Sequence, residues 1–329
     1  MFCAFHLAIV ATPTTSNRNV FTMTSHLQQT LLDSSIELIP FHEKESYLEA
    51  RRVAPKIVLE ESNPSRFLDF CQGNQAAAAR ALVNYWKRRT AVYGERAFRP
   101  LSCIPGESAL SDETIELITS GHIAFLPDDS EGSPVVCWDP SRLLTLAYRP
   151  RVESGFYFAQ IASEARNAFR KGWVVLIMLS SSDHFDHIAI ENFTRVLSTM
   201  PVRTKAWHFI NCIPKWKKDD EYESFVQHVT HLFRNILCHE KFYFHAPSEK
   251  LELTASLQQH GLPLSGLPKC VGGSWSYKNT EVWLEKRQKL DLAFLQRCKE
   301  NRSGESNFQR AVSIQVLYTL AVRVKFNAQ

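Results

Sequence analysis

The densest group of possible metal ligands in this sequence is the run Asp183–His187, which holds two aspartates and two histidines. Its histidines have the H-x-x-H spacing that can place two imidazoles on one side of a helical turn. The run lacks the glutamate that a zinc-protease helix carries between its histidines, and no third ligand stands nearby. We interpret it as a polar loop after a buried strand rather than as a metal site.

Motifs for covalent or nucleotide-dependent catalysis are missing from the sequence. Gly106-Glu107-Ser108 does not complete the G-x-S-x-G turn that presents a nucleophilic serine. The chain has neither a phosphate-binding G-x-x-x-x-G-K-[ST] loop nor a G-x-G-x-x-G dinucleotide fingerprint. Without a triad or a metal set, we expect a protein that is not an enzyme, with no catalytic residues, no cofactor and no metal.

Other histidines fall on predicted elements. His228 and His231 lie on the polar side of a predicted helix, where they are either ordinary surface residues or a pH-sensitive pair. His208 and His245 lie on predicted strands, and we interpret them as core or pocket-edge residues.

Charge and cysteine content narrow the class of partner. The chain has 329 residues and a net charge of +4, a mild excess that does not favour nucleic acid. We interpret the compact basic run Lys87-Arg88-Arg89 as the solvated end of a helix. Eight scattered cysteines without a C-x-x-C pair indicate reduced thiols in a cytoplasmic protein rather than disulfides or a zinc ribbon.

The continuously apolar segment Trp173–Leu179 is the strongest indicator of fold class. Such a segment is typical of a strand buried on both faces of a sheet that helices cover. Other strands are predicted within 132–138 and at 206–211 and 242–245, and helices at 153–170, 188–200 and 221–237. Strands that alternate with helices predict an α/β fold with a mainly parallel sheet and right-handed crossovers.

A small all-helical domain is predicted before the sheet. Four consecutive alanines at 76–79 precede Leu82, Tyr85, Trp86 and Arg89, whose three- and four-residue spacing indicates a helix with one buried face. We divide the chain into a disordered leader at 1–35, this helical domain at 36–100, an α/β domain at 101–275 and a C-terminal extension at 276–329. The extension is expected to hold a charged helix near 280–299 and a final strand near 313–326.

Several short segments occur together in a characteristic order. They are Arg66-Phe67-Leu68, the stretch 84–89, Gly132-Ser133-Pro134-Val135, Pro201-Val202-Arg203, Lys241-Phe242, and Leu267-Pro268 with Gly272-Gly273. No single segment is specific, but their order and spacing over residues 60–275 resemble the CRAL-TRIO family, which includes retinaldehyde-binding, tocopherol-transfer and yeast phosphatidylinositol-transfer proteins.

The resemblance implies an apolar cavity between the sheet and a movable amphipathic gate helix. By position, the gate would span about 216–237, where apolar residues recur with a 3.6-residue period. The implied cavity lining is Trp173, Val175, Ile177, Phe209 and Tyr243 on the strands, and Phe225, Val229 and Phe233 on the gate. A helix with one apolar stripe can seal a cavity in water and lie on a bilayer when it swings out. The same stripe also fits an ordinary core-facing helix.

The resemblance also bears on the lipid headgroup. Lys241 matches a lysine that phosphoinositide-binding members place at the mouth of the last strand, and it is the candidate phosphate contact. Cys71 and Gln72 stand where those members have a basic pair, so charge-assisted phosphate recognition is weakened. Trp173 and Val175 stand where phosphatidylcholine-binding members use small hydroxyl residues, which favours a less polar, isoprenoid- or sterol-like ligand.

The predicted function is therefore binding of a hydrophobic lipid, with transfer or presentation between membranes. The partners would be a phospholipid or an isoprenoid or sterol-like lipid and, transiently, a membrane surface, with no nucleic acid. We expect a cytoplasmic monomer that associates with membranes reversibly. The alternative is a protein-interaction scaffold of the same family without transfer activity.

Overall fold

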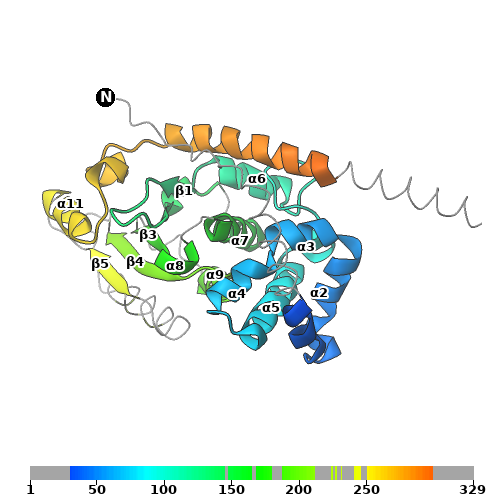
Figure 1. Ribbon diagram of the computed structural model, residues 1–329. Helices are drawn as coiled ribbons and strands as arrows, with labels where there is room; N and C mark the ends of the chain where they lie inside the picture. The colour runs from blue at the N-terminus through cyan, green and yellow to red at the C-terminus, as the bar shows by residue number, and fades with distance from the viewer. Residues whose placement is uncertain are drawn as a thin grey trace, which may run out of the picture.

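The computed structural model describes residues 30–144, 147–164, 168–179, 187–211, 241–245 and 250–298, together with Ser224, Gln227 and His231. Within these residues, helices flank a mixed five-stranded sheet (Figure 1). Its strands lie side by side in the order β1 (Ile123–Leu126), β2 (Val135–Trp138), β3 (Trp173–Leu179), β4 (Thr204–Asn211) and β5 (Phe242–His245). The β1–β2 pair is antiparallel and the other three pairs are parallel, which confirms the predicted α/β class.

The central strand β3 is buried on both faces, as its continuous apolar sequence predicts. Successive strand residues point to opposite faces of a sheet. Trp173, Val175 and Ile177 join a large core with α7 (Tyr148–Glu164) and α9 (His187–Leu197). The alternate residues of β3 join a second core against α11 (Lys250–Gln259). The sheet therefore separates two apolar layers.

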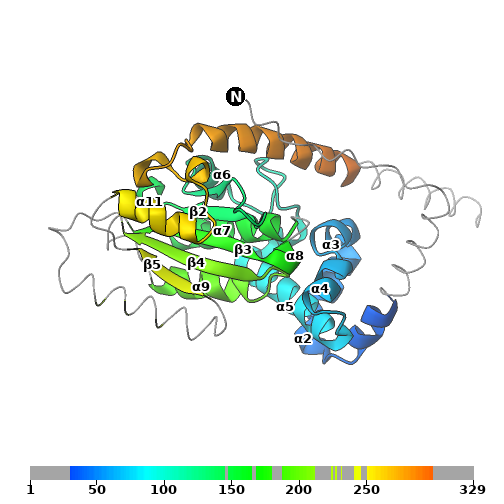
Figure 2. The same cartoon turned by 60° about the vertical axis from the view of Figure 1, so that its left-hand side comes forward.

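The front of the chain is helical, as predicted (Figure 2). Its elements are α2 (Phe41–Val53), α3 (Pro55–Glu61), α4 (Pro64–Phe70), α5 (Gln75–Tyr93) and the 3-10 helix η1 (Gly94–Phe98). The side chain of Asn74 accepts a hydrogen bond from the Ala77 amide at the start of α5, and Ser111 caps α6 (Asp112–Thr119) in the same way. Side chains of α5, including Tyr85 and Trp86, enter the same core as Trp173, so the front helices and the sheet share one apolar interior.

A long helix at residues 278–298 follows the sheet and runs along one side of the molecule to the front helices (Figures 1 and 2). The ring of Trp283 stacks on Phe158 of α7 at 5.8 Å between centroids and meets Phe125 of β1 at 5.3 Å. The charged helix predicted near 280–299 is thus confirmed for the described residues. Residues 1–29 of the predicted leader and the strand predicted at 313–326 lie outside them. Residues 30–35, which were assigned to the disordered leader, are helical, and Leu32 is fully buried, so this part of the prediction is wrong.

Three element predictions need correction. Strand β1 and helix α11 were not expected, since a four-residue strand and a weakly patterned helix give little periodic signal. Helix α7 begins at Tyr148 rather than near Glu153. Pro150 lies in its first turn, where the missing amide hydrogen costs no helical hydrogen bond. The described helical residues run from Tyr148 to Glu164 in α7 and continue at α8 (Ala168–Lys171) before β3; residues 165–167 lie outside the described part of the chain.

The segment Leu267–Gly273 folds as a tight reversal against the second core. It contains the 3-10 helix η6 (Lys269–Val271), after which Gly272 adopts a φ of +96°. A Cβ atom on Gly273 would lie 2.0 Å from the Leu267 carbonyl oxygen, so the backbone contact requires glycine. The reversal buries Leu267, Val271 and Trp275 beside the sheet. Its glycine pair therefore has a local structural cause.

Candidate functional site

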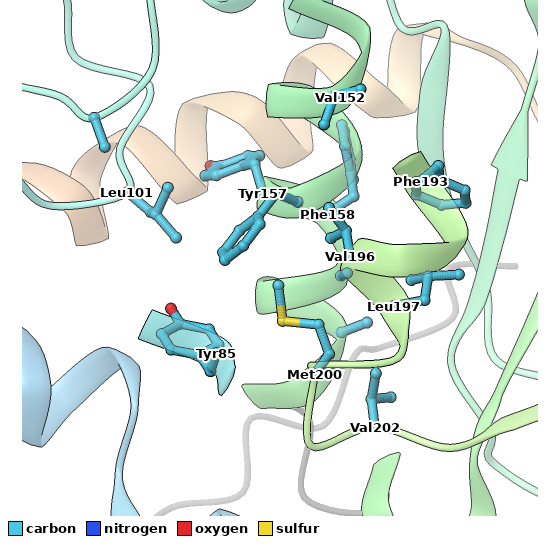
Figure 3. Packing of buried hydrophobic residues seen from close by; sticks show 14 of the residues in the cluster. Tyr85, Leu101, Val152, Tyr157, Phe158, Phe193, Val196, Leu197, Met200 and Val202 are labelled. Carbon is cyan, nitrogen blue, oxygen red and sulfur yellow. The ribbon is translucent and has the colours of Figure 1, made fainter. Parts of the chain in front are cut away.

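Phe193 of α9 covers the middle of the sheet on the α7 and α9 side. Its ring lies 5.6 Å from Trp138 on β2 and 6.5 Å from Trp207 on β4, measured between ring centroids. Because β3 runs between β2 and β4, Phe193 lies over β3. Figure 3 shows Phe193, Val196 and Leu197 of α9 beside the side chains of α7, in agreement with the packing of these two helices.

A glycine in α7 makes this close packing possible. A Cβ atom on Gly155 would lie 2.5 Å from Cδ2 of Phe193, so the ring occupies the space that a side chain would need. The cavity that remains beside Gly155, Phe193 and Trp138 has a volume of about 10 Å³, roughly the smallest space that holds one water.

The residues predicted to line a lipid cavity on β3 and β4 are consequently buried against neighbouring side chains. Trp173, Val175 and Ile177 are at most 2% exposed, and Phe209 on β4 is 1% exposed. A hollow wide enough for a lipid tail would leave accessible surface on these side chains. The packed state of β3 therefore offers a ligand no space beside Val175 and Ile177.

The same face of the sheet becomes accessible toward β5. Four aromatic residues form what we call the aromatic floor: Trp207, Phe209, Phe242 and Phe244. In the register of the two strands Trp207 pairs with Phe242 and Phe209 with Phe244. The rings of Phe209 and Phe244 stack at 4.7 Å with an interplanar angle of 10°. Phe242 is half-buried and Phe244 is 37% exposed, so the floor is dry near β3 and reaches solvent at β5.

Tyr243 does not belong with the other predicted lining residues. It pairs with His208 across β4 and β5, and its ring lies 4.0 Å from that of His260, which follows α11. Trp173, Val175, Ile177 and Phe209 belong to the core on the opposite face. The five strand residues therefore do not line one cavity. Phe242 and Phe244, which sequence reasoning passed over, are the β5 residues on the Phe209 side, and only the strand register could reveal this.

A hydrogen-bonded chain links β4, β5 and α11 on the second face. Nδ1 of His208 lies 2.9 Å from Nε2 of His245, and Nδ1 of His245 lies 3.0 Å from Oγ of Ser256. Burial, followed by the neighbouring imidazoles, lowers the pKa of His208 to about 3 and that of His245 to about 4. Both rings are therefore neutral near pH 7. They are core residues, as expected. Among the described residues, no group of His, Cys, Asp and Glu side chains can hold a metal ion.

The residues considered for headgroup recognition are not members of the aromatic floor. Lys241 is exposed immediately before β5, and its carbonyl accepts a hydrogen bond of 2.8 Å from the Trp207 amide. Cys71 caps the C-terminus of α4, and Gln72 follows with a φ of +55°. Nη2 of Arg203 donates to the Phe70 carbonyl at 3.3 Å, so one cation lies beside the position where the basic pair is missing.

Most of the predicted gate lies outside the described residues, including Phe225, Val229, Phe233 and His228. The same holds for residues 183–186 of the aspartate and histidine run, whereas His187 begins α9. Ser224, Gln227 and His231 are helical and exposed. Their spacing places them on one side of a helix, which is the polar side of the predicted period.

No family model and no curated protein matches this chain. In the part of the chain that the structure describes, no helix has both the length and the apolar character needed to cross a bilayer.

Proposed function

We propose that this chain binds a hydrophobic ligand non-covalently on the aromatic floor of β4 and β5, and that it transfers or presents that ligand between membranes. The observation that carries the proposal is the exposed ring of Phe244, stacked on the buried ring of Phe209. A large aromatic surface at a sheet edge gains about 25 cal/mol for each Å² that a ligand removes from water.

The order of elements supports this location. The amphipathic stretch at 221–237 stands in the sequence between β4 and β5, the two strands that form the floor. In parallel sheets such connections are right-handed, which favours the face that already carries α7 and α9. We therefore propose this stretch as the gate, with Phe225, Val229 and Phe233 toward the ligand.

The chemistry of the floor indicates a class of ligand. Its four side chains are aromatic and carry no hydroxyl or charge, so they favour an isoprenoid, sterol-like or acyl body over a polar headgroup. Lys241 is exposed at the start of β5 and is the candidate contact for a phosphate when the ligand has one. We propose no chemical step on the ligand.

Extraction of the purified full-length protein with organic solvent, followed by mass spectrometry, tests the proposal. We expect a co-purifying lipid in the wild type and roughly a tenfold smaller amount in Phe244→Gln, since a polar side chain removes apolar contact at the floor's open end. Phe41→Gln is the matched control, because Phe41 is an exposed aromatic residue on α2. Equal lipid content in both variants, or an empty wild type that ignores offered isoprenoids and phospholipids, would contradict the proposal.

The tight packing of Phe193 over β3 favours a second candidate, a protein-interaction scaffold without a bound lipid. In that case the exposed floor would contact a protein. An empty wild type in the extraction experiment supports this alternative.

A further inference from the structure

The basic run on α5 does not form a solvated helix end. Lys87 is exposed, Arg88 is half-buried and Arg89 is fully buried. Consecutive residues on a helix point about 100° apart, so the three cations enter three different environments. Arg89 belongs to the core of the front helices, and Arg88 faces a groove between α5, α7 and α9.

This groove is a cavity of about 350 Å³, large enough for a small ligand or a headgroup. Its apolar base includes Val92 of α5, Val152 of α7 and Val196 of α9. Groups that can hydrogen bond stand around this base, among them Arg88 of α5 and Arg149 of α7. Three helices that pack in one core hold these groups, so the groove is preformed.

Arg88 has no hydrogen bond or ion pair with a carboxylate among the described residues. Burial, followed by the positive charge of Arg195 on α9, lowers the pKa of its guanidinium. Arg195 already pairs with Glu191 of its own helix. A half-buried cation beside a like charge is unfavourable, and an anion in the groove would remove the cost.

The acids near the groove do not compensate this charge. Nε of Arg149 donates to Oε1 of Glu153 at 3.0 Å, and Nη2 of Arg96 donates to the same oxygen at 2.6 Å. The other carboxylate oxygen of Glu153 accepts hydrogen bonds from Ser111 and Thr114. Glu153 is thus fully engaged, and the groove keeps an excess of positive charge.

We propose that the groove between α5, α7 and α9 binds the phosphate group of a ligand, with Arg88 as its principal contact. A guanidinium donates paired hydrogen bonds that match phosphate oxygens. Arg149 also lines the groove and shares the single charge of Glu153 with Arg96, so it adds positive charge suited to a doubly charged phosphate. The phosphate belongs either to a soluble molecule or to a lipid headgroup. This site is separate from the aromatic floor, and it stands whether or not an apolar ligand binds there.

Two probes distinguish these sources, and both use the full chain at low ionic strength. Calorimetric titration with inorganic phosphate measures binding of the free group. Sedimentation with phosphatidylcholine vesicles, with and without phosphatidic acid, measures binding of a headgroup. We expect Arg88→Gln to weaken the response that the wild type shows by at least about tenfold, which corresponds to about 1.4 kcal/mol.

Lys87→Gln is the matched control, because it removes the same charge from the neighbouring exposed position. We expect it to change binding by less than about twofold, since exposed charges interact weakly. A response to phosphate assigns the site to the free group, and a response to vesicles alone assigns it to a headgroup; both support the proposal. It is overturned if neither probe binds, or if Arg88→Gln and Lys87→Gln lose binding equally. Unchanged thermal unfolding of Arg88→Gln shows that a loss of binding is local.

Discussion

Arg89 shows how one residue joins several segments of the front helices. It is 0% exposed and forms an ion pair with Glu61 of α3. Its Nε donates to the Ala97 carbonyl and its Nη2 to the Arg99 carbonyl, each at 2.7 Å. Burial opposes its charge, but Glu61 raises the pKa of the guanidinium above its ordinary value. All of this holds η1 and the following chain against α5.

Replacing Arg89 with methionine is predicted to lower the free energy of unfolding by about 3 to 5 kcal/mol, because Glu61 would remain buried without its partner. Urea unfolding followed by circular dichroism measures the loss. The exposed neighbour supplies the control, as Lys87→Met should stay within about 0.5 kcal/mol. In the double variant Arg89→Met with Glu61→Met, part of the loss should return. A loss below about 1 kcal/mol for Arg89→Met would refute this account.

The burial of Arg89 can be predicted in part from the sequence. The spacing of Leu82, Tyr85, Trp86 and Arg89 predicts a common buried side, and all four are buried. The run of adjacent basic residues suggests a solvated helix end instead, and this interpretation is wrong for Arg88 and Arg89. Periodicity gives the direction of a side chain, whereas the acid that neutralises Arg89 comes from α3, outside the periodic stretch.

At the scale of elements, the positions of the strands were easier to predict than the strand register and the helix packing over the sheet. The apolar run of β3 and the short strands β2, β4 and β5 follow from composition and spacing. The side of Tyr243 depends on the β4–β5 register, which no local pattern encodes. The packing of Phe193 against Gly155 depends on how closely two helices approach. The tight packing over β3 therefore could not be predicted from the sequence either.

The link between β4, β5 and α11 makes stability depend on pH. His208 and His245 have pKa values of about 3 and about 4 when folded, below the ordinary value near 6.5. At pH values between the folded pKa of each histidine and its ordinary pKa, the unfolded chain binds more protons than the folded one. Their contribution to stability is therefore complete above about pH 6.5 and is lost as the pH falls to about 4 for His245 and about 3 for His208.

His245→Gln is predicted to weaken this pH dependence. In urea unfolding between about pH 7.5 and pH 4.5, the variant should take up about one proton fewer on unfolding than the wild type. His122, whose pKa burial lowers to about 4, contributes equally to both proteins and cancels in the comparison. The exposed His42 provides the control, and His42→Gln should retain the wild-type slope. Equal slopes for His245→Gln and the wild type would exclude this origin.

At the scale of the whole molecule, the helix at 278–298 connects the two ends of the core. Near its start, Trp283 packs on Phe125 and Phe158 beside the sheet. In its second half, Oδ2 of the buried Asp291 accepts a hydrogen bond of 2.9 Å from the Cys103 amide. Arg297 pairs with Glu60 of α3 at 3.1 Å. The helix thus spans from the sheet to the front helices, which already share an apolar core with the sheet.

Such continuity predicts that the described fold unfolds as one unit, and Trp283→Ala tests this. The substitution removes ring contacts with β1 and α7, and we expect a loss of about 2 to 3 kcal/mol in unfolding free energy for this partly buried ring. Tryptophan fluorescence and far-ultraviolet circular dichroism should report the same urea midpoint in the variant, because one core carries both signals. Leu290→Ala on the same helix is the control, since Leu290 is exposed and should cost less than about 0.5 kcal/mol. Two separated transitions in Trp283→Ala would mean that the front helices and the sheet are stable independently, and that the helix at 278–298 only rests on them.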